Sequence, residues 1–169
     1  MVTLPASGNR VNVKQPPTPG VRFPPPVIFG VSLAIGFLLQ RFFPVALLET
    51  FGNSPLRLIG GIFLILAASL ALCAFLALQG VHTPIRPDRP VSSLVTHGVF
   101  RLSRNPLYLS LSLAHAGISL SANALWPLLS LLPVLLVIRY SVIAREESYL
   151  LERFGAEYEA YLHSVRRWI

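Results

Sequence analysis

The sequence is poor in cysteine, and Cys73 is the single one among 169 residues. An internal disulfide and a cysteine-cluster metal site are therefore excluded, and Cys73, within an apolar run, is expected to be a small packing residue. The sequence also contains no G-x-G-x-x-G after a predicted strand, no P-loop, no H-E-x-x-H and no G-x-S-x-G motif. The common fingerprints of soluble cofactor sites are thus missing, and we expect no metal.

Charged residues are also scarce. They make up 12% of the chain, whereas hydrophobic residues make up 53% and the mean hydropathy is +0.62. A soluble domain of this length carries about twice that share of charge. A bilayer would supply the apolar surroundings that such a composition needs, so we expect an integral membrane protein with one domain.

The charges are unbalanced, with 14 lysines and arginines against seven acidic residues and a net charge of +7. They are not interleaved with aromatic residues on a soluble face, so we expect no nucleic-acid partner. They fall between apolar runs: Arg10, Lys14 and Arg22 before the first, Arg86, Arg89, Arg101 and Arg104 in the central connection, and others after the last. Because such an excess marks cytoplasmic segments, we expect a multi-pass protein of a prokaryotic cytoplasmic membrane. Its N-terminal anchor should be uncleaved and both termini cytoplasmic.

The ends of the chain differ in composition. Residues 1–25 are rich in proline and poor in apolar side chains, which predicts a flexible tail. Such a tail is more typical of a linker than of a proline-rich partner motif. Residues 26–169 are expected to form a single domain.

The apolar runs of that domain predict membrane helices. Spans are expected over residues 27–48 and 56–78, the second with Gly60-Gly61 and Ala67-Ala68 for close helix contact. The run over residues 107–143 is broken at residues 121–123, which predicts a hairpin whose first helix is short. Together these runs predict about four transmembrane spans.

The last segment, residues 144–165, combines charge with an apolar stripe at i, i+3 and i+4 spacing. This pattern predicts an amphipathic helix at the cytoplasmic interface, bent or divided at Gly155. Arg166, Arg167 and Trp168 are expected to anchor its end. The predicted fold is therefore all-α, a polytopic membrane helical bundle followed by a C-terminal amphipathic helix.

A compact polar segment, residues 97–108 (HGVFRLSRNPLY), separates the second and third apolar runs. It ends a connection that is too long and too polar for a simple turn, and loops of this size are usually functional. It places two arginines, a histidine and a tyrosine where the membrane begins. We expect the chemistry of the protein to lie here.

Glu146 and Glu147 form an adjacent pair of carboxylates at the start of the amphipathic helix. Glu147 shares a face with Leu151, Phe154 and Tyr158, and a carboxylate on a buried face needs a partner. One interpretation is an ion pair at the membrane edge with Arg139, Arg145 or an arginine of the loop. The other is a site completed by a cationic or polyhydroxylated ligand.

A polar stripe runs along the third predicted span, because Tyr108, Ser112, His115 and Ser119 share one helical face. Polar groups in a membrane helix face protein or water. For His115 alone, helix packing is the better interpretation. The whole stripe favours a polar cleft beneath the 97–108 segment, with Arg139 facing the same interior or the cytoplasmic edge.

The order of these motifs resembles that of a known family. His-Gly-x-Phe-Arg-x-x-Arg-Asn-Pro-x-Tyr is followed by a hairpin, Arg-Glu-Glu-x-x-Leu, Phe-Gly-x-x-Tyr-x-x-Tyr and Val-Arg-Arg-Trp. This order is similar to that of the isoprenylcysteine carboxyl methyltransferases and the related phospholipid methyltransferases, with the likeness strongest over residues 80–169.

The resemblance implies methyl transfer that depends on S-adenosyl-L-methionine, with a prenylated, lipid or other lipophilic acceptor entering from the bilayer. By position, it implies a cofactor site framed by His97, Gly98, Val99, Arg104, Asn105, Pro106, Tyr108, Glu146 and Glu147. Arg104 and Glu147 are expected to lie closest to the methyl transfer and to be catalytic. An isoprenylcysteine carboxylate and a lipid amine both remain open as acceptors.

Two other functions compete with this one. Asn105 stands where many members of the family have histidine, which is compatible with a non-catalytic membrane scaffold. A membrane reductase of the sterol-reductase type would hold NADPH in a comparable pocket, but the extra phosphate of NADPH favours more positive charge than this segment provides. The oligomeric state does not follow from the sequence.

Overall fold

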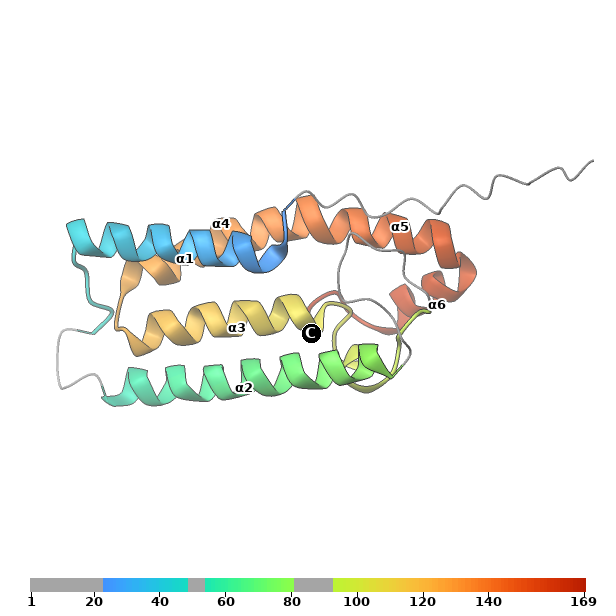
Figure 1. Ribbon diagram of the computed structural model, residues 1–169, viewed down its shortest axis with the longest axis horizontal. Helices are drawn as coiled ribbons and strands as arrows, with labels where there is room; N and C mark the ends of the chain where they lie inside the picture. Colours follow the sequence, from blue (N-terminus) through green and yellow to red (C-terminus); the bar gives the residue numbers. More distant parts are fainter. Residues whose placement is uncertain (1–22, 49–53, 81–92) are drawn as a thin grey trace, which may run out of the picture.

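The computed structural model describes residues 23–48, 54–80 and 93–169 (Figure 1). Most of the predicted tail, residues 49–53, and Arg86 and Arg89 lie outside these ranges. The elements are α1 (Pro25–Phe42), α2 (Ser54–Gln79), the 3-10 helix η1 (Gly98–Arg101), α3 (Pro106–Ser121), α4 (Leu125–Val137), the π-helix η2 (Ile138–Ile143), α5 (Ala144–Phe154) and α6 (Ala156–Ser164). The described ranges contain no β-strand, which confirms the all-α class.

Four helices lie lengthwise in a bundle, with α1 packed on α4 and α2 packed on α3 (Figure 1). The pair α3 and α4 is the predicted hairpin, and it turns at residues 122–124, where Asn123 adopts a φ of 51°. The predicted division of the last segment is also confirmed, because Gly155, with a φ of 52°, separates α5 from α6.

Among the described residues, three helices are long and apolar enough to cross a membrane: Pro25–Phe42, Pro55–Gln79 and the continuous rod Leu125–Phe154. The first ends before the predicted residue 48, because Pro44 follows it and proline does not continue a helix. Helix α3 has 16 residues, about 24 Å at 1.5 Å per residue, and is the short member of the hairpin. The membrane helical bundle is thus confirmed, and a fourth crossing by α3 stays a prediction.

Helices α2 and α3 approach closely where both carry glycine. A Cβ built on Gly60 would lie 2.6 Å from the carbonyl oxygen of Gly117, and one on Gly117 would lie 2.9 Å from that of Gly60. Gly61 faces open space instead. Of the predicted small residues, Gly60 therefore meets α3 and Ala67, one heptad later, is buried, whereas Ala68 is exposed.

The rod from α4 through η2 to α5 brings polar side chains out of the apolar region. Its 30 residues span about 45 Å, more than the roughly 30 Å of bilayer hydrocarbon. Within it, Ile138, Val142 and Ile143 pack with Phe29 and Val134 in a buried cluster. The π-helix, with its wider turn, changes the helical phase just before Glu146 and Glu147, as such insertions often do near functional sites.

One end of the bundle collects the polar segments. Helix α2 ends there, α3 begins there, and η1, α5, α6 and the C-terminus lie around this end (Figure 1). At the opposite end, Asn123 connects the turn between α3 and α4 to the residues that follow α1. Its side-chain oxygen accepts hydrogen bonds from the backbone N–H groups of Leu47 and Leu48 at 3.0 Å each. The end of the bundle that carries η1, α5, α6 and the C-terminus is therefore where we look for a functional site.

Candidate active site

Two backbone constraints shape the 97–108 segment. Gly98 begins η1 with a φ of 60°, a left-handed conformation that glycine adopts without steric cost. Pro106 begins α3, at the position where the N–H that proline lacks has no helical partner. Between them, the chain makes a turn in which the buried Ser103 accepts a hydrogen bond through Oγ from the backbone N–H of Asn105 at 3.1 Å.

The C-terminal segment, residues 165–169, lies against this turn (Figure 1). The backbone N–H of Arg104 donates to the carbonyl of Arg166 at 3.0 Å. The carbonyl of Arg167 accepts hydrogen bonds from Ser103 Oγ at 3.2 Å and from Asn105 Nδ2 at 3.1 Å. Two segments more than 60 residues apart are thus joined by three hydrogen bonds.

Tyr161 of α6 makes a further connection to η1. Its hydroxyl donates to the carbonyl of Phe100 at 2.6 Å, and its ring is buried. Burial raises the pKa of Tyr161 to about 12, although the positive charge of Arg104 acts in the opposite direction. The phenol therefore stays neutral and donates its hydrogen bond at physiological pH.

Glu147 is held by two arginines from different parts of the chain. Its Oε1 lies 3.1 Å from Arg104 Nη2 of the 97–108 segment and accepts from Arg167 Nε at 3.0 Å. Its Oε2 accepts from Arg167 Nη2 at 2.5 Å. The hydrogen bonds to Glu147 raise the pKa of Arg167 above its usual value. The ion-pair interpretation is therefore confirmed for Glu147, with a loop arginine as one partner.

Of the three guanidinium nitrogens of Arg104, two have partners. Its Nη2 is used by Glu147, and its Nη1 donates to the carbonyl of Leu162 at 3.4 Å. Its Nε is buried and has no hydrogen-bond partner within the described parts of the chain. An unsatisfied buried guanidinium N–H is costly, and it is suited to an anionic or carbonyl oxygen.

Glu146 has a different environment from its neighbour. The hydroxyl of Tyr108, at the start of α3, donates to Glu146 Oε1 at 2.6 Å. In the described ranges no arginine or lysine forms an ion pair with this carboxylate. Tyr108 also packs against the buried cluster of α1, α4 and η2. Glu146 therefore presents a carboxylate oxygen at the boundary between the polar end and the apolar core.

The predicted site residues are only partly brought together. Arg104 pairs with Glu147, Tyr108 donates a hydrogen bond to Glu146, and Asn105 donates one to the backbone of the C-terminal segment. Pro106 is buried at the start of α3. His97 is exposed before η1, and Gly98 faces open space. Val99 is half-buried, and its carbonyl accepts from the backbone N–H groups of Leu102 and Ser103. These three residues border the site without joining its polar network.

The polar stripe on α3 mostly serves packing. Ser112 and Ser119 donate to carbonyls of their own helix at 2.8 Å, and His115 Nε2 lies 2.8 Å from the carbonyl of Pro127. Only Tyr108 reaches the carboxylates. The interior position considered for Arg139 is wrong, because Arg139 is exposed and its guanidinium lies 5.5 Å from the ring centre of Tyr140.

Arg167 is the site residue that the sequence did not reveal. Its position in a terminal Arg-Arg-Trp motif predicted an interfacial anchor, yet it binds Glu147, and Trp168 packs against the buried cluster. One signal was present: Glu147 lies on the buried stripe and needs a cation. The sequence alone offered several arginines for that role and could not choose among them.

Two comparisons with known proteins gave matches. The family model described as phospholipid methyltransferase matches residues 56–157, from α2 into α6. An uncharacterised protein of Haemophilus influenzae is 41% identical over 63 residues, which cover 37% of this chain and all of that protein. The family match includes both carboxylates and the whole 97–108 segment but ends before Arg167.

Proposed function

The chain belongs to the phospholipid methyltransferase family, and on this premise we propose that it transfers the methyl group of S-adenosyl-L-methionine to a lipophilic acceptor at the membrane surface. The family assigns a membrane methyltransferase in general terms. The cofactor, the acceptor and the roles of individual residues are parts of the proposal. The observation that carries it is a pair of unlike groups at one end of the bundle. One is the Arg104 Nε–H, which is buried and has no partner in the described residues, and the other is the carboxylate of Glu146, the chain neighbour of the Glu147 that binds Arg104.

This set of groups fits S-adenosyl-L-methionine, which combines a carboxylate with an ammonium group and ribose hydroxyls. The Arg104 Nε–H is a donor for the carboxylate. Glu146, with Tyr108 as its hydrogen-bond partner, is an acceptor for the ammonium or for the hydroxyls. Glu147 has its charge matched by Arg104 and Arg167, so its contribution is to orient Arg104.

When bound, S-adenosyl-L-methionine supplies a methyl group on a sulfonium centre that a nucleophile displaces in line. Such a displacement depends on alignment and on the exclusion of water more than on a strong base. In this chain, Arg104 and Glu146 would provide the alignment. The C-terminal segment, bonded across the turn at residues 103–105, would cover the polar end and limit the access of water.

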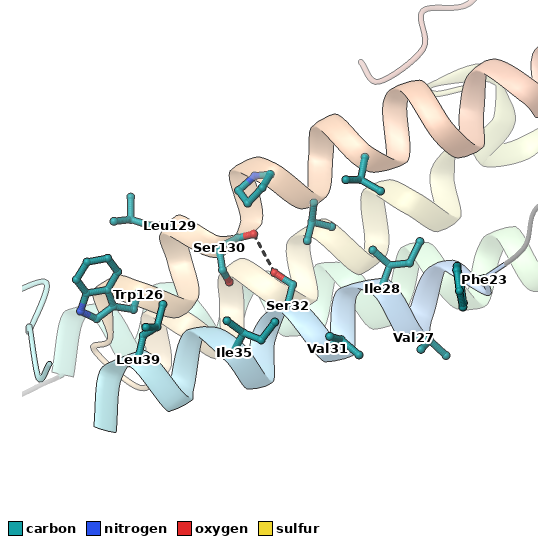
Figure 2. A pocket seen from close by; sticks show the side chains of 13 residues that line it. Phe23, Val27, Ile28, Val31, Ser32, Ile35, Leu39, Trp126, Leu129 and Ser130 are labelled. Carbon is teal, nitrogen blue, oxygen red and sulfur yellow. Dashed lines mark hydrogen bonds between the residues drawn. The ribbon is translucent and has the colours of Figure 1, made fainter. Parts of the chain in front are cut away.

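An apolar groove between α1 and α4 supports a lipophilic acceptor (Figure 2). It has a volume of about 700 Å³. Its walls are almost entirely apolar, and its polar residues Ser32 and Ser130 are connected by a hydrogen bond from Ser32 Oγ to the carbonyl of Ser130 at 2.9 Å. Leu39 and Trp126 lie at one end of the groove, and Phe23 and Val27 lie at the other (Figure 2).

The groove and the candidate site are connected through the buried apolar cluster. Ile28 and Val134 line the groove and also belong to the apolar contacts that include Tyr108, the partner of Glu146. An alkyl or isoprenoid chain in the groove would therefore lead toward the carboxylates. From Val27 to Leu39 the groove follows thirteen residues of α1, about 18 Å, which suits one extended chain.

A transfer assay tests the proposal. Purified protein in lipid nanodiscs is incubated with S-adenosyl-L-methionine carrying a tritiated methyl group, and the organic extract is counted. We expect label in the extract from wild-type protein, at least tenfold less from Tyr108→Phe, and an unchanged amount from Tyr140→Phe, whose ring is exposed. Mild base then separates the acceptors, because a methyl ester releases volatile methanol and a methylated amine does not. No label above the background of empty nanodiscs, over a series of carboxylate and amine lipids, would contradict the proposal.

A groove-filling variant tests the acceptor site separately. Ile35→Trp places a large side chain in the groove, whereas Ile65→Trp places one on the exposed face of α2. We expect the first variant to raise the KM for the acceptor severalfold without changing cofactor binding, and the second to leave both unchanged. Equal effects of the two variants would remove the groove from the proposal.

A further inference from the structure

Arg167 lies outside the residues matched by the family model and nevertheless donates two hydrogen bonds to the Glu147 carboxylate. Its guanidinium binds both carboxylate oxygens, the two-pronged geometry that gives an arginine–carboxylate pair its directional specificity. Glu147 is 15% exposed and Arg167 30% exposed, so this pair is only partly open to water. Its strength is therefore not lost to solvent screening as that of an exposed surface pair would be.

The backbone of the same segment is fixed independently of that ion pair. The carbonyls of Arg166 and Arg167 accept three hydrogen bonds from Ser103, Arg104 and Asn105, and Trp168 packs against the buried cluster. Arg167 is therefore held from both sides of its Cα. The side chain reaches Glu147 from a fixed base, which lowers the conformational entropy lost on forming the pair.

Because Arg167 fixes the position of the Glu147 carboxylate, it also restricts the guanidinium of Arg104, which binds the same carboxylate. Its Oε1, the oxygen bound by Arg167 Nε, also lies 3.1 Å from Arg104 Nη2. Because a guanidinium is planar, fixing Nη2 at Glu147 and Nη1 at the Leu162 carbonyl also fixes the direction of the Nε–H. That N–H is the buried donor without a partner in the described residues.

We propose that Arg167 is a positioning residue, which holds Glu147 so that the free N–H of Arg104 is oriented for the carboxylate of the bound cofactor. This inference rests on the proposed function and extends it to the C-terminal segment. It also implies that the C-terminal segment is part of the cofactor site and not only a membrane anchor.

Arg166 supplies a matched control. It is adjacent, has the same charge, and contributes its backbone carbonyl, but its side chain is exposed. Arg166→Ala and Arg167→Ala therefore remove the same charge from the same segment. Arg167→Lys keeps the charge and loses the two-pronged geometry.

The first test measures the binding of S-adenosylhomocysteine to the three variants by calorimetry in detergent. We expect the Kd to rise at least tenfold in Arg167→Ala, by an intermediate factor in Arg167→Lys, and by less than twofold in Arg166→Ala. The KM for the acceptor should stay within twofold in all three. If wild-type protein binds but Arg167→Ala and Arg166→Ala behave alike, this inference is wrong while the proposed function stands. If wild-type protein does not bind, the proposed function itself fails.

The second test needs no ligand. Hydrogen–deuterium exchange is followed in the peptide that contains residues 102–106, where the backbone N–H of Arg104 is bonded to Arg166. We expect exchange in this peptide to be faster in Arg167→Ala than in Arg166→Ala, because loss of the Glu147 pair loosens the C-terminal segment. Combining Glu147→Gln with Arg167→Ala should add little to either single effect. Additive effects, or equal exchange in the two arginine variants, would contradict the proposed linkage.

Discussion

At the scale of single residues, the two adjacent glutamates have different surroundings and different roles. Glu147 has its charge matched by two guanidinium groups, while Glu146 is bonded to the neutral hydroxyl of Tyr108. Adjacent residues on a helix point about 100° apart, so α5 can direct one carboxylate toward the C-terminal segment and the other toward α3. This division leaves Glu146 as the group suited to contact a ligand.

Removal of either partner of the Arg104–Glu147 pair leaves an unpaired charge in a largely buried position. We expect Arg104→Ala and Glu147→Ala each to lower the free energy of unfolding by about 3 kcal/mol. The double variant should lose less than the sum of the two by about 1 kcal/mol or more. Denaturant titration in detergent measures these energies.

The control for this pair is Glu157→Ala, which removes an exposed carboxylate of α6 and should change stability by less than about 0.5 kcal/mol. Membrane insertion should be intact in all variants, and both site variants should bind the cofactor much more weakly. Unchanged cofactor binding in both would remove these residues from the site.

The sequence predicted the individual residues of the site better than it predicted their partners. The need of Glu147 for a cation followed from its place on a buried stripe, but the choice of Arg104 and Arg167 depends on contacts across 43 and 20 residues. Such pairings are set by the path of the chain between them. The role of Arg167 could not be derived from local sequence for this reason.

At the scale of elements, Tyr161 connects α6 to η1 through a hydrogen bond that depends on its proton. Its pKa in the folded protein is about 12, above the ordinary value of 10.0, so the unfolded chain loses the phenol proton first. The stability from this group is therefore complete below pH 10 and is lost as the pH rises toward 12. We expect the stability of wild-type protein to fall more steeply over this window than that of Tyr161→Phe. Thermal unfolding across the window measures the difference, and parallel curves would refute it.

The contact between α2 and α3 depends on one of two neighbouring glycines. In Gly60→Ala the added methyl would lie 2.6 Å from the Gly117 carbonyl oxygen and would also clash with Ser121 Oγ, so the helices must separate. We expect a loss of about 1 to 3 kcal/mol in the free energy of unfolding. Gly61→Ala, which meets no atom within 4 Å, should be neutral, and equal effects of the two variants would show that the helices do not pack as described.

The helices themselves could be predicted from apolar runs, and their ends from proline and glycine. Which face of a helix packs against its neighbour could not be predicted. Gly60 and Gly61 are adjacent in the sequence, and of these two only Gly60 contacts α3. The π-helix at Ile138–Ile143 was also not predicted from the sequence. The phase of α5, and with it the direction of both carboxylates, depends on this turn.

At the scale of the whole molecule, the two ends of the bundle have opposite characters. The site end gathers η1, α5, α6 and the C-terminus, and the other end is closed by Asn123 and the residues that follow α1 (Figure 1). We propose that the site end faces the cytoplasm, in line with the arginine excess of its segments.

Cysteine labelling tests this orientation. In a Cys73→Ser background, cysteine replaces either the exposed His163 at the site end or Val45 at the opposite end. On intact cells, a membrane-impermeant maleimide should label Val45→Cys at once and His163→Cys only after permeabilisation. The reverse pattern would place the site outside the cytoplasm.

The proposed cofactor site is tested most directly by a calorimetric titration of S-adenosylhomocysteine into the detergent-purified protein, with NADPH titrated in parallel. We expect micromolar binding of S-adenosylhomocysteine, loss of that binding in Arg104→Ala, and no binding of NADPH. Binding of NADPH alone would indicate a reductase of the sterol-reductase type, and binding of neither would indicate a membrane scaffold. Either of these two results would contradict the assignment of a methyltransferase cofactor site.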